Sequence, residues 1–543
     1  MPLLRTILLL LLVALLLPVI HAQDAPFHIM LKPVTQKDAM FPGLQSYAYA
    51  QHGGKWLLIG GRLDGLHRRQ PWATFDQEGH NRRIYVIDPE TQQWWWSGLE
   101  TLPQPLQEQL SATNMQFYQN GNALYLIGGY GHSPSYGDHT TFAYLTRVMV
   151  SELMNAIVNK EPIAGYFTQI SDPQFAVCGG RLDKLHQTYY LVGGQWFDGR
   201  YNPRNGPSFE QIYTNQVRRF TLAETDGKLT VLHLPPFTDE QNLHRRDYNL
   251  LPQIFPDGRQ GLTAFSGVFQ HNQDIPFLNS TDIDSSGYVV NNRFSQYLNH
   301  YHCATIALYD SLTNQMHSLF FGGIAQYTAD QNGALLQDAD VPFVPTLARI
   351  TRFADGKMQE YKLPVEMPVL LGAGAELIKN PMLPVYPNQT LKLHRFANDT
   401  VLLGYIYGGI ESTLPNIFWN NEGDLSIATG RLMQVYLVKS KPDVDLPLHI
   451  PIVQSSNGLG LQLFPNPAEG DFYVHFTLAE PTSVHLSILG LDGEVLFEKD
   501  YPNLTAGKHQ FRYLMGGIRQ KNMLVKVTTD RGATYSQKVV IND

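Results

Sequence analysis

Two histidines have the residue type and spacing of metal ligands. His300 and His302 flank a tyrosine and stand directly before Cys303. On a β-strand alternate residues point to one face, so the two imidazoles could coordinate a single ion. Because no carboxylate accompanies them, we interpret them as ordinary polar residues. We therefore predict no metal site and no bound cofactor.

An acidic stretch at 282–287, Asp-Ile-Asp-Ser-Ser-Gly, resembles part of a calcium-binding loop. It lacks the glutamate that would close such a loop, so we interpret it as a polar turn. The motifs of zinc proteases, of phosphate-binding loops and of serine hydrolases are also missing from the chain. We therefore predict no catalytic residues.

Aromatic and polar side chains gather in segments that each follow a pair of glycines. Several of these segments are long for hairpin connections, and long loops in compact domains are often functional. Aromatic rings mixed with hydrogen-bonding groups suit the binding of sugars or peptides. The alternative is that the loops only pack on one another. The candidate ligand-binding residues are Arg62, His67, Arg68, Trp72, His132, Tyr136, Trp196, Asp198, Arg200, Tyr201, Tyr327 and Trp419.

The glycine pairs themselves end short apolar runs that are typical of buried strands. Glycines at such ends indicate crowded backbones or a positive φ. Two further strand-like runs follow each pair and one precedes it, so each unit predicts four antiparallel strands, as in one propeller blade. The units are marked by Gly60-Gly61, Gly128-Gly129, Gly193-Gly194, a degenerate Ser266-Gly267, Gly322-Gly323 and Gly408-Gly409.

These repeats resemble those of kelch β-propellers. Besides the glycine pairs, the resemblance rests on a Tyr-x-x-Asp-Pro…Trp pattern, clearest at Tyr85, Asp88, Pro89 and Trp94. The spacing between units is longer than in a typical kelch repeat, and most units lack the tryptophan. The resemblance implies a kelch-type β-propeller of six four-stranded blades at residues 23–440. Together with the small C-terminal β-sandwich that the last strand patterns predict, the expected fold class is all-β.

The first strand of the mature chain is expected to close the propeller ring. The sixth unit has no obvious fourth strand, whereas residues 27–33 form an orphan strand that ends in proline. We predict that this strand pairs with residues 432–438, which would remove an open sheet edge. Ile29 and Leu31 would then be buried, and His28 and Met30 would point the other way.

Both ends of the chain carry targeting signals. Arg5 precedes an apolar stretch that is too short to span a bilayer, so we interpret residues 1–22 as a signal peptide and predict no transmembrane helix. A stretch rich in Pro, Ser, Gly and Asn at 441–460 is typical of a linker. Residues 461–543 then show short, evenly spaced strand patterns that favour a sandwich.

The C-terminal segment resembles the type A C-terminal sorting domain of the type IX secretion system. The resemblance rests on Phe-Pro-Asn-Pro at 464–467, Leu-x-Ala-Gly-x-His at 504–509 and Lys-Val-Val-Ile at 538–541. It implies the type IX secretion machinery as a partner. It also implies a secreted or outer-membrane-surface location in a Gram-negative bacterium.

Composition narrows the functional classes further. The net charge is -8 without basic blocks, so nucleic acid is not an expected partner. The chain has two cysteines, Cys178 and Cys303, which fall in non-adjacent units, so we predict free thiols. We interpret the protein as a ligand-binding or interaction module for a glycan or a protein.

The alternative is a carbohydrate-active or oxidoreductase enzyme on the same scaffold. Some kelch-like propellers are copper-radical oxidases, which need a Tyr–Cys pair together with two histidines. Tyr301 and Cys303 lie beside the two histidines, but no second Tyr-His pair occurs at a matching place.

Overall fold

The structure is a computed structural model of the chain. The protein divides into two compact units, Met1–His449 and Ile450–Asp543. The structure describes residues 26–36, 41–68, 73–201, 209–225, 227–271, 274–329, 333, 335–338, 340–418, 421–439, 446–448, 459–468, 471–490, 495–514, 522–530 and 534–541.

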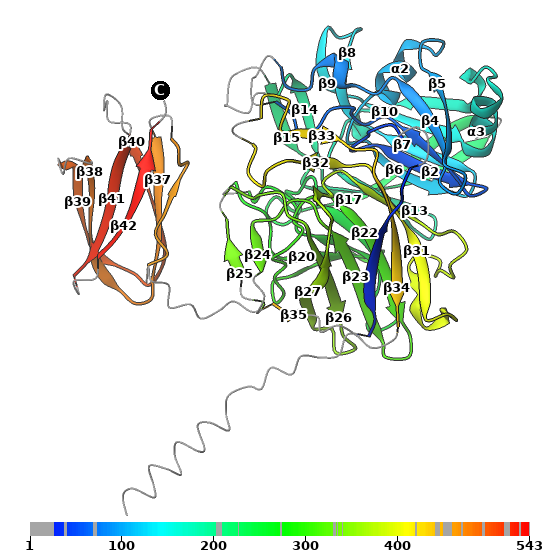
Figure 1. The fold of residues 1–543 in the computed structure, drawn as a ribbon. Coiled ribbons are helices and arrows are strands. Elements are labelled where there is room, and N and C mark those ends of the chain that lie inside the picture. The colour runs from blue at the N-terminus through cyan, green and yellow to red at the C-terminus, as the bar shows by residue number, and fades with distance from the viewer. Residues whose placement is uncertain are drawn as a thin grey trace, which may run out of the picture. The chain divides into compact units, whose positions relative to one another are not determined.

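The first unit contains six four-stranded antiparallel blades (Figure 1). Blade 1 has β2 (Ala48–His52), β3 (Lys55–Ile59), β4 (Arg83–Asp88) and β5 (Gln93–Gly98). Blade 2 has β6 (Gln116–Asn120), β7 (Ala123–Ile127), β10 (Tyr144–Met149) and β11 (Phe167–Ser171). Blade 3 has β12 (Arg181–Leu185), β13 (Thr188–Val192), β16 (Gln216–Thr225) and β17 (Lys228–Thr238).

The other three blades follow the same order of strands. Blade 4 has β18 (Asn249–Ile254), β19 (Gln260–Phe265), β20 (Ser280–Ile283) and β21 (Tyr288–Asn291). Blade 5 has β22 (Ala304–Asp310), β23 (Gln315–Phe321), β26 (Thr346–Arg352) and β27 (Met358–Glu366). Blade 6 has β29 (Glu376–Lys379), β31 (Thr400–Tyr407), β34 (Leu432–Val438) and β1 (His28–Pro33). The predicted all-β propeller of six four-stranded blades is confirmed by these sheets.

The glycine pairs join one blade to the next. The amide N–H of the second glycine of every pair donates to a backbone carbonyl of the following blade, at 2.7–3.1 Å. The backbones are crowded there, because a Cβ on Gly128 would lie 1.9 Å from the Val177 carbonyl oxygen. Gly128 also has a φ of +63°. Both predicted roles of these glycines are therefore confirmed. The acceptors are the carbonyls of Ala112, Val177, Arg245, His300, Leu371 and Leu44.

Gly128→Ala is expected to destabilise the propeller more than Gly121→Ala does. Gly121 has a φ of +62° but no heavy atom within 4 Å of the place that a Cβ would occupy, so alanine there costs only the left-handed strain of about 1–2 kcal/mol. At Gly128 the clash with Val177 adds about 1–3 kcal/mol. Urea denaturation of both variants measures the difference, and equal losses would contradict the crowding argument.

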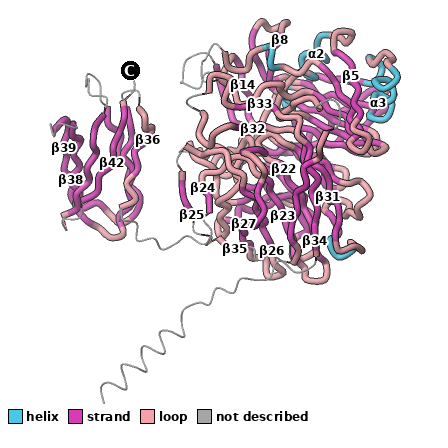
Figure 2. Tube along the Cα trace, viewed as in Figure 1, coloured by secondary structure: helices cyan, strands magenta, loops and turns pink. Residues whose placement is uncertain are grey.

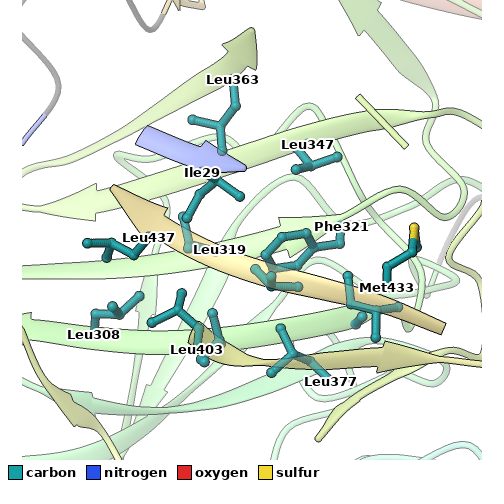
Figure 3. Packing of buried hydrophobic residues seen from close by; sticks show 14 of the residues in the cluster. Ile29, Leu308, Leu319, Phe321, Leu347, Leu363, Leu377, Leu403, Met433 and Leu437 are labelled. Atoms are coloured by element: carbon teal, nitrogen blue, oxygen red, sulfur yellow. The ribbon is translucent and has the colours of Figure 1, made fainter. Parts of the chain in front are cut away.

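The predicted ring closure is confirmed. Strand β1 pairs antiparallel with β34, and His28 lies opposite Val438 while Pro33 lies opposite Met433. Figure 1 shows β1 in dark blue beside β34. Ile29 is 5% exposed within the core between blades 5 and 6 (Figure 3), whereas Met30 is 42% exposed.

Segments between the second and third strands of the blades emerge on one face, called the loop face below. In blades 2, 3, 5 and 6 they form strands of small sheets (Figure 2). One four-stranded sheet, called the canopy below, spans blades 2 and 3. It consists of β8 (Tyr130–Ser133), β9 (Asp138–Thr141), β14 (Gln195–Gly199) and β15 (Phe209–Tyr213). A second small sheet pairs β24 (Tyr327–Ala329) with β25 (Leu335–Gln337). A third contains β28 (Leu370–Leu371), β32 (Ile410–Ser412) and β33 (Ser426–Ala428).

Short helices connect some of the strands. The α-helices are α2 (Gln104–Leu110) and α3 (Val150–Asn159), and the 3-10 helices are η1 (Gln77–Gly79), η2 (Ala164–Tyr166), η3 (Pro173–Phe175) and η4 (Leu393–Arg395). Among the described residues no helix is both long and apolar enough to cross a membrane.

On the side opposite the loop face, one connection of blade 6 contacts blades 4 and 5. The connection 380–399 of blade 6 lies across the ends of three inner strands. Its β30 (Leu391–Lys392) pairs with β22 of blade 5, and Asn388 Nδ2 donates to the Gln253 carbonyl of blade 4 at 2.9 Å. Lys379 of blade 6 donates to the carbonyl of Gln389 at 2.9 Å.

The second unit contains two packed antiparallel sheets around its own core, as the predicted small sandwich requires. One sheet has β36 (Gln462–Phe464), β37 (Asp471–Leu478) and β40 (Gly507–Leu514). The other has β38 (Thr482–Gly490), β39 (Val495–Leu504), β41 (Asn522–Thr529) and β42 (Thr534–Val540). Within the predicted linker, β35 (Leu446–Pro447) pairs with β27 of the first unit.

Candidate functional site

A closed ring of backbone hydrogen bonds surrounds the channel axis at the loop face. Six residues, one from each blade, take part just before the inner strands. Each amide N–H donates to the carbonyl of its neighbour at 2.7–3.3 Å, and the sixth bond returns to the first residue. The ring fixes where the adjoining side chains stand around the axis. In order it joins Ser46, Gly374, His302, Asp247, Gly179 and Asn114.

Polar side chains of three blades meet at this ring. Glu376 accepts from His302 Nε2 at 2.9 Å and from Arg181 Nη1 at 3.3 Å. Burial alone would raise the pKa of Glu376, but the charge of Arg181 and the bond from His302 hold it below its ordinary value. The cavity between these groups has a volume of about 10 Å³, about enough for one water molecule. The ring therefore forms a nearly filled polar floor.

Above this floor stands a half-buried arginine that is held on two sides. Arg246 Nε donates to the Tyr213 hydroxyl at 3.0 Å, and its Nη1 pairs with the Asp247 carboxylate. Its guanidinium carbon lies 5.2 Å from the centre of the Phe269 ring. The side chains of Arg246 and Asp247 are 18% and 21% exposed. Both groups are fixed in place and reachable from solvent.

Two more tyrosines and a histidine complete what we call the mouth cluster, defined as His67, Tyr201, Tyr213, Arg246, Asp247 and Tyr301. The His67 ring lies 4.9 Å from that of Tyr201. Burial lowers the pKa of His67 to about 4, so this imidazole is neutral at pH 7. Burial raises the pKa of Tyr201 and of Tyr301, so both hydroxyls keep their protons and can donate.

Three of the predicted arginines hold the loops together. Arg62 is 1% exposed and donates to Asp64 at 2.6 Å. Arg200 Nε donates to the Thr74 carbonyl at 2.8 Å, and its Nη2 pairs with Asp76. Arg68 lies 3.7 Å from the same Asp76 carboxylate. Arg200 thus joins the loops of blades 1 and 3, whereas Arg62 and Arg68 bond within the loop of blade 1.

Four other predicted residues lie on the canopy. The Tyr136 hydroxyl donates to Asp198 at 3.0 Å, and Tyr136 is 60% exposed. Trp196 is half-buried opposite Ile212, and the rings of His132 and His139 are 5.3 Å apart.

The remaining predicted residues are spread over other blades. Tyr327 packs on Tyr297 of blade 5, with ring centres 5.2 Å apart. Trp72 and Trp419 lie outside the described residues. Of the predicted set, only His67 and Tyr201 belong to the mouth cluster.

The two candidate metal ligands have separate environments. Residues 299–303 are not in a strand, so the alternation considered for them does not apply. His300 is buried, with Nε2 bonded to the Gln296 carbonyl and Nδ1 accepting from the Gln326 amide, both at 3.0 Å. His302 instead bonds Glu376. In the part of the chain that the structure describes, no three His, Cys, Asp or Glu side chains are grouped to hold a metal.

The other sequence features have structural explanations. Asp284 Oδ1 accepts from the amides of Ser286 and Gly287, so these residues form a polar turn. The cysteines are free and buried, as predicted. Burial raises the pKa of Cys178 and of Cys303 to about 12, so both are unreactive thiols at neutral pH.

Sequence reasoning missed Tyr213, Arg246, Asp247 and the polar floor, although a signal for the ring is present. In the first three units the ring residue stands at a constant distance before the first glycine of the pair, at 46 and 60, 114 and 128, and 179 and 193. Aligning the units on their glycine pairs would have found these three positions.

Comparisons with known proteins give little beyond the fold. No family model matches the chain, and no curated protein matches it. Among solved structures, one described as "Structure of YjhT" is similar at 12% sequence identity. That similarity covers 73% of this chain and 98% of the other, with a TM-score of 0.39.

Proposed function

We propose that the propeller is a ligand-binding module and that the mouth cluster is its site for a carbohydrate. The observation that carries this proposal is the grouping of three tyrosines around the Arg246–Asp247 pair at the open end of the channel. Aromatic faces beside a few fixed donors and acceptors suit the alternating apolar and hydroxylated surfaces of a sugar.

The proposal includes export of the protein. The apolar stretch at 1–22 supports passage through the inner membrane, and the motifs at 464–467, 504–509 and 538–541 support handling by the type IX secretion machinery. A site open on the loop face would then meet glycans outside the cell or at its surface. Cell fractionation with and without residues 461–543 tests this part.

Arg246→Ala is expected to weaken carbohydrate binding about tenfold or more. The substitution removes a charged donor and leaves Tyr213 without its partner, a loss of about 1.5–3 kcal/mol. A glycan array would identify sugars that bind the wild type, and calorimetry would compare the variant. Arg512→Ala, an exposed arginine of the second unit, is the matched control and should bind like the wild type. Unchanged affinity in a folded Arg246→Ala protein would contradict the proposed site.

A further inference from the structure

The charges at the channel mouth are compensated within the protein. Arg246 is paired with Asp247, and Arg181 lies 3.3 Å from Glu376. All four side chains are at most 21% exposed, so water screens them only weakly. Each arginine therefore has an opposite charge in direct contact.

The neighbouring loops continue this balance. Arg62 pairs with Asp64, and Arg200 pairs with Asp76. Arg68 shares Asp76 but is 49% exposed, where its charge is screened by solvent. Asp274 is also exposed, and its negative charge acts on Tyr201. The set of arginines named here is thus matched by an equal number of carboxylates.

An anionic ligand would meet unfavourable conditions in such a site. Among the described residues of the mouth its charge would lose water without gaining an unpaired cation, and it would approach the carboxylates of Asp247 and Glu376. His67 offers no compensation because it is neutral. Sugar hydroxyls, in contrast, can accept from Tyr201, Tyr301 and the outer edge of Arg246 without any net charge.

We infer that the mouth cluster takes an uncharged carbohydrate and that the Asp247 carboxylate is what makes it reject anions. This inference rests on the proposed function and names the ligand class of the same site. Because the polar floor leaves only about 10 Å³, about one hydroxyl or water can enter it and the sugar ring itself stays in the mouth.

Asp247→Asn tests the inference. Asparagine keeps the shape, tolerates the left-handed backbone at this position (φ +50°) and removes the charge that compensates Arg246. Galactose with galacturonate, and glucose with glucuronate, are matched probes that differ by one carboxylate. We expect the wild type to bind the neutral member about tenfold or more tightly. We expect Asp247→Asn to shift that ratio at least tenfold toward the acid.

Inorganic sulfate provides a test that needs no sugar. Sulfate should stabilise Asp247→Asn in a saturable way that chloride at equal ionic strength does not reproduce, whereas the wild type should show no saturable effect. Glu411→Gln is the matched control, because it removes the charge that pairs with Arg431, an arginine outside the mouth cluster. Saturable sulfate binding by the wild type, its preference for uronates, or an unchanged anion response in Asp247→Asn would overturn the inference. If no sugar binds but the sulfate results hold, the proposed function fails while the charge balance stands.

Discussion

Ile29→Asp is expected to abolish cooperative unfolding of the propeller, whereas Met30→Asp is expected to change its stability by about 0.5 kcal/mol or less. Ile29 is 5% exposed among apolar side chains of blades 5 and 6 (Figure 3). An aspartate there would be a buried charge without a partner, which costs several kcal/mol. That loss is comparable with the whole stability of a typical domain. The exposed Met30 is the next residue of the same strand and serves as the control.

Tryptophan fluorescence can follow this transition in the full chain. All seven tryptophans lie before residue 450, so urea unfolding monitored this way reports the propeller alone. Removing residues 23–33 should have the same effect as Ile29→Asp, since it exposes the edge of β34 to aggregation. Removing residues 461–543 should leave the transition unchanged. A wild-type transition in the Ile29→Asp protein would show that closure of blade 6 does not depend on β1.

The blades could be predicted from sequence because their determinants are local. A short apolar run that ends at two glycines indicates a buried strand whose end lies close to another backbone. Six such runs predict a closed ring of blades. Even the long-range pairing of β1 followed from counting strands. One strand at each end of the propeller sequence lacks a partner, and pairing these two strands removes both open sheet edges.

The mouth cluster could not be predicted in the same way. Tyr201, Tyr213, Arg246 and Tyr301 come from connections that differ in length between units, and their meeting depends on how the loop-face segments fold. The prediction from the long loops included His67 and Tyr201 but not Tyr213 or Arg246. Others of the predicted residues, such as Arg200 and Tyr136, join one loop to another, which is the alternative considered for them.

Asp282→Ala is expected to destabilise the propeller by about 3–5 kcal/mol. The Arg352 guanidinium donates to both carboxylate oxygens of Asp282, at 2.8 Å and 2.6 Å, and so joins β26 of blade 5 to β20 of blade 4. The side chains are 6% and 17% exposed. Removing the carboxylate leaves a buried cation whose desolvation is no longer offset. It also removes the acceptor of the Thr263 hydroxyl, which lies 2.5 Å from Asp282.

Combining Asp282→Ala with Arg352→Met separates the buried charge from the loss of contacts. If the uncompensated guanidinium causes most of the destabilisation, the double variant should recover about 1–4 kcal/mol relative to Asp282→Ala, because an apolar side chain needs no counter-charge. Lys357→Ala removes an exposed partner of Asp355 and should cost about 0.5 kcal/mol or less. If the stability lost in the double variant equals the sum of the losses in the two single variants, the pair stabilises the contact between blades 4 and 5 through packing. Its charges would then be dispensable.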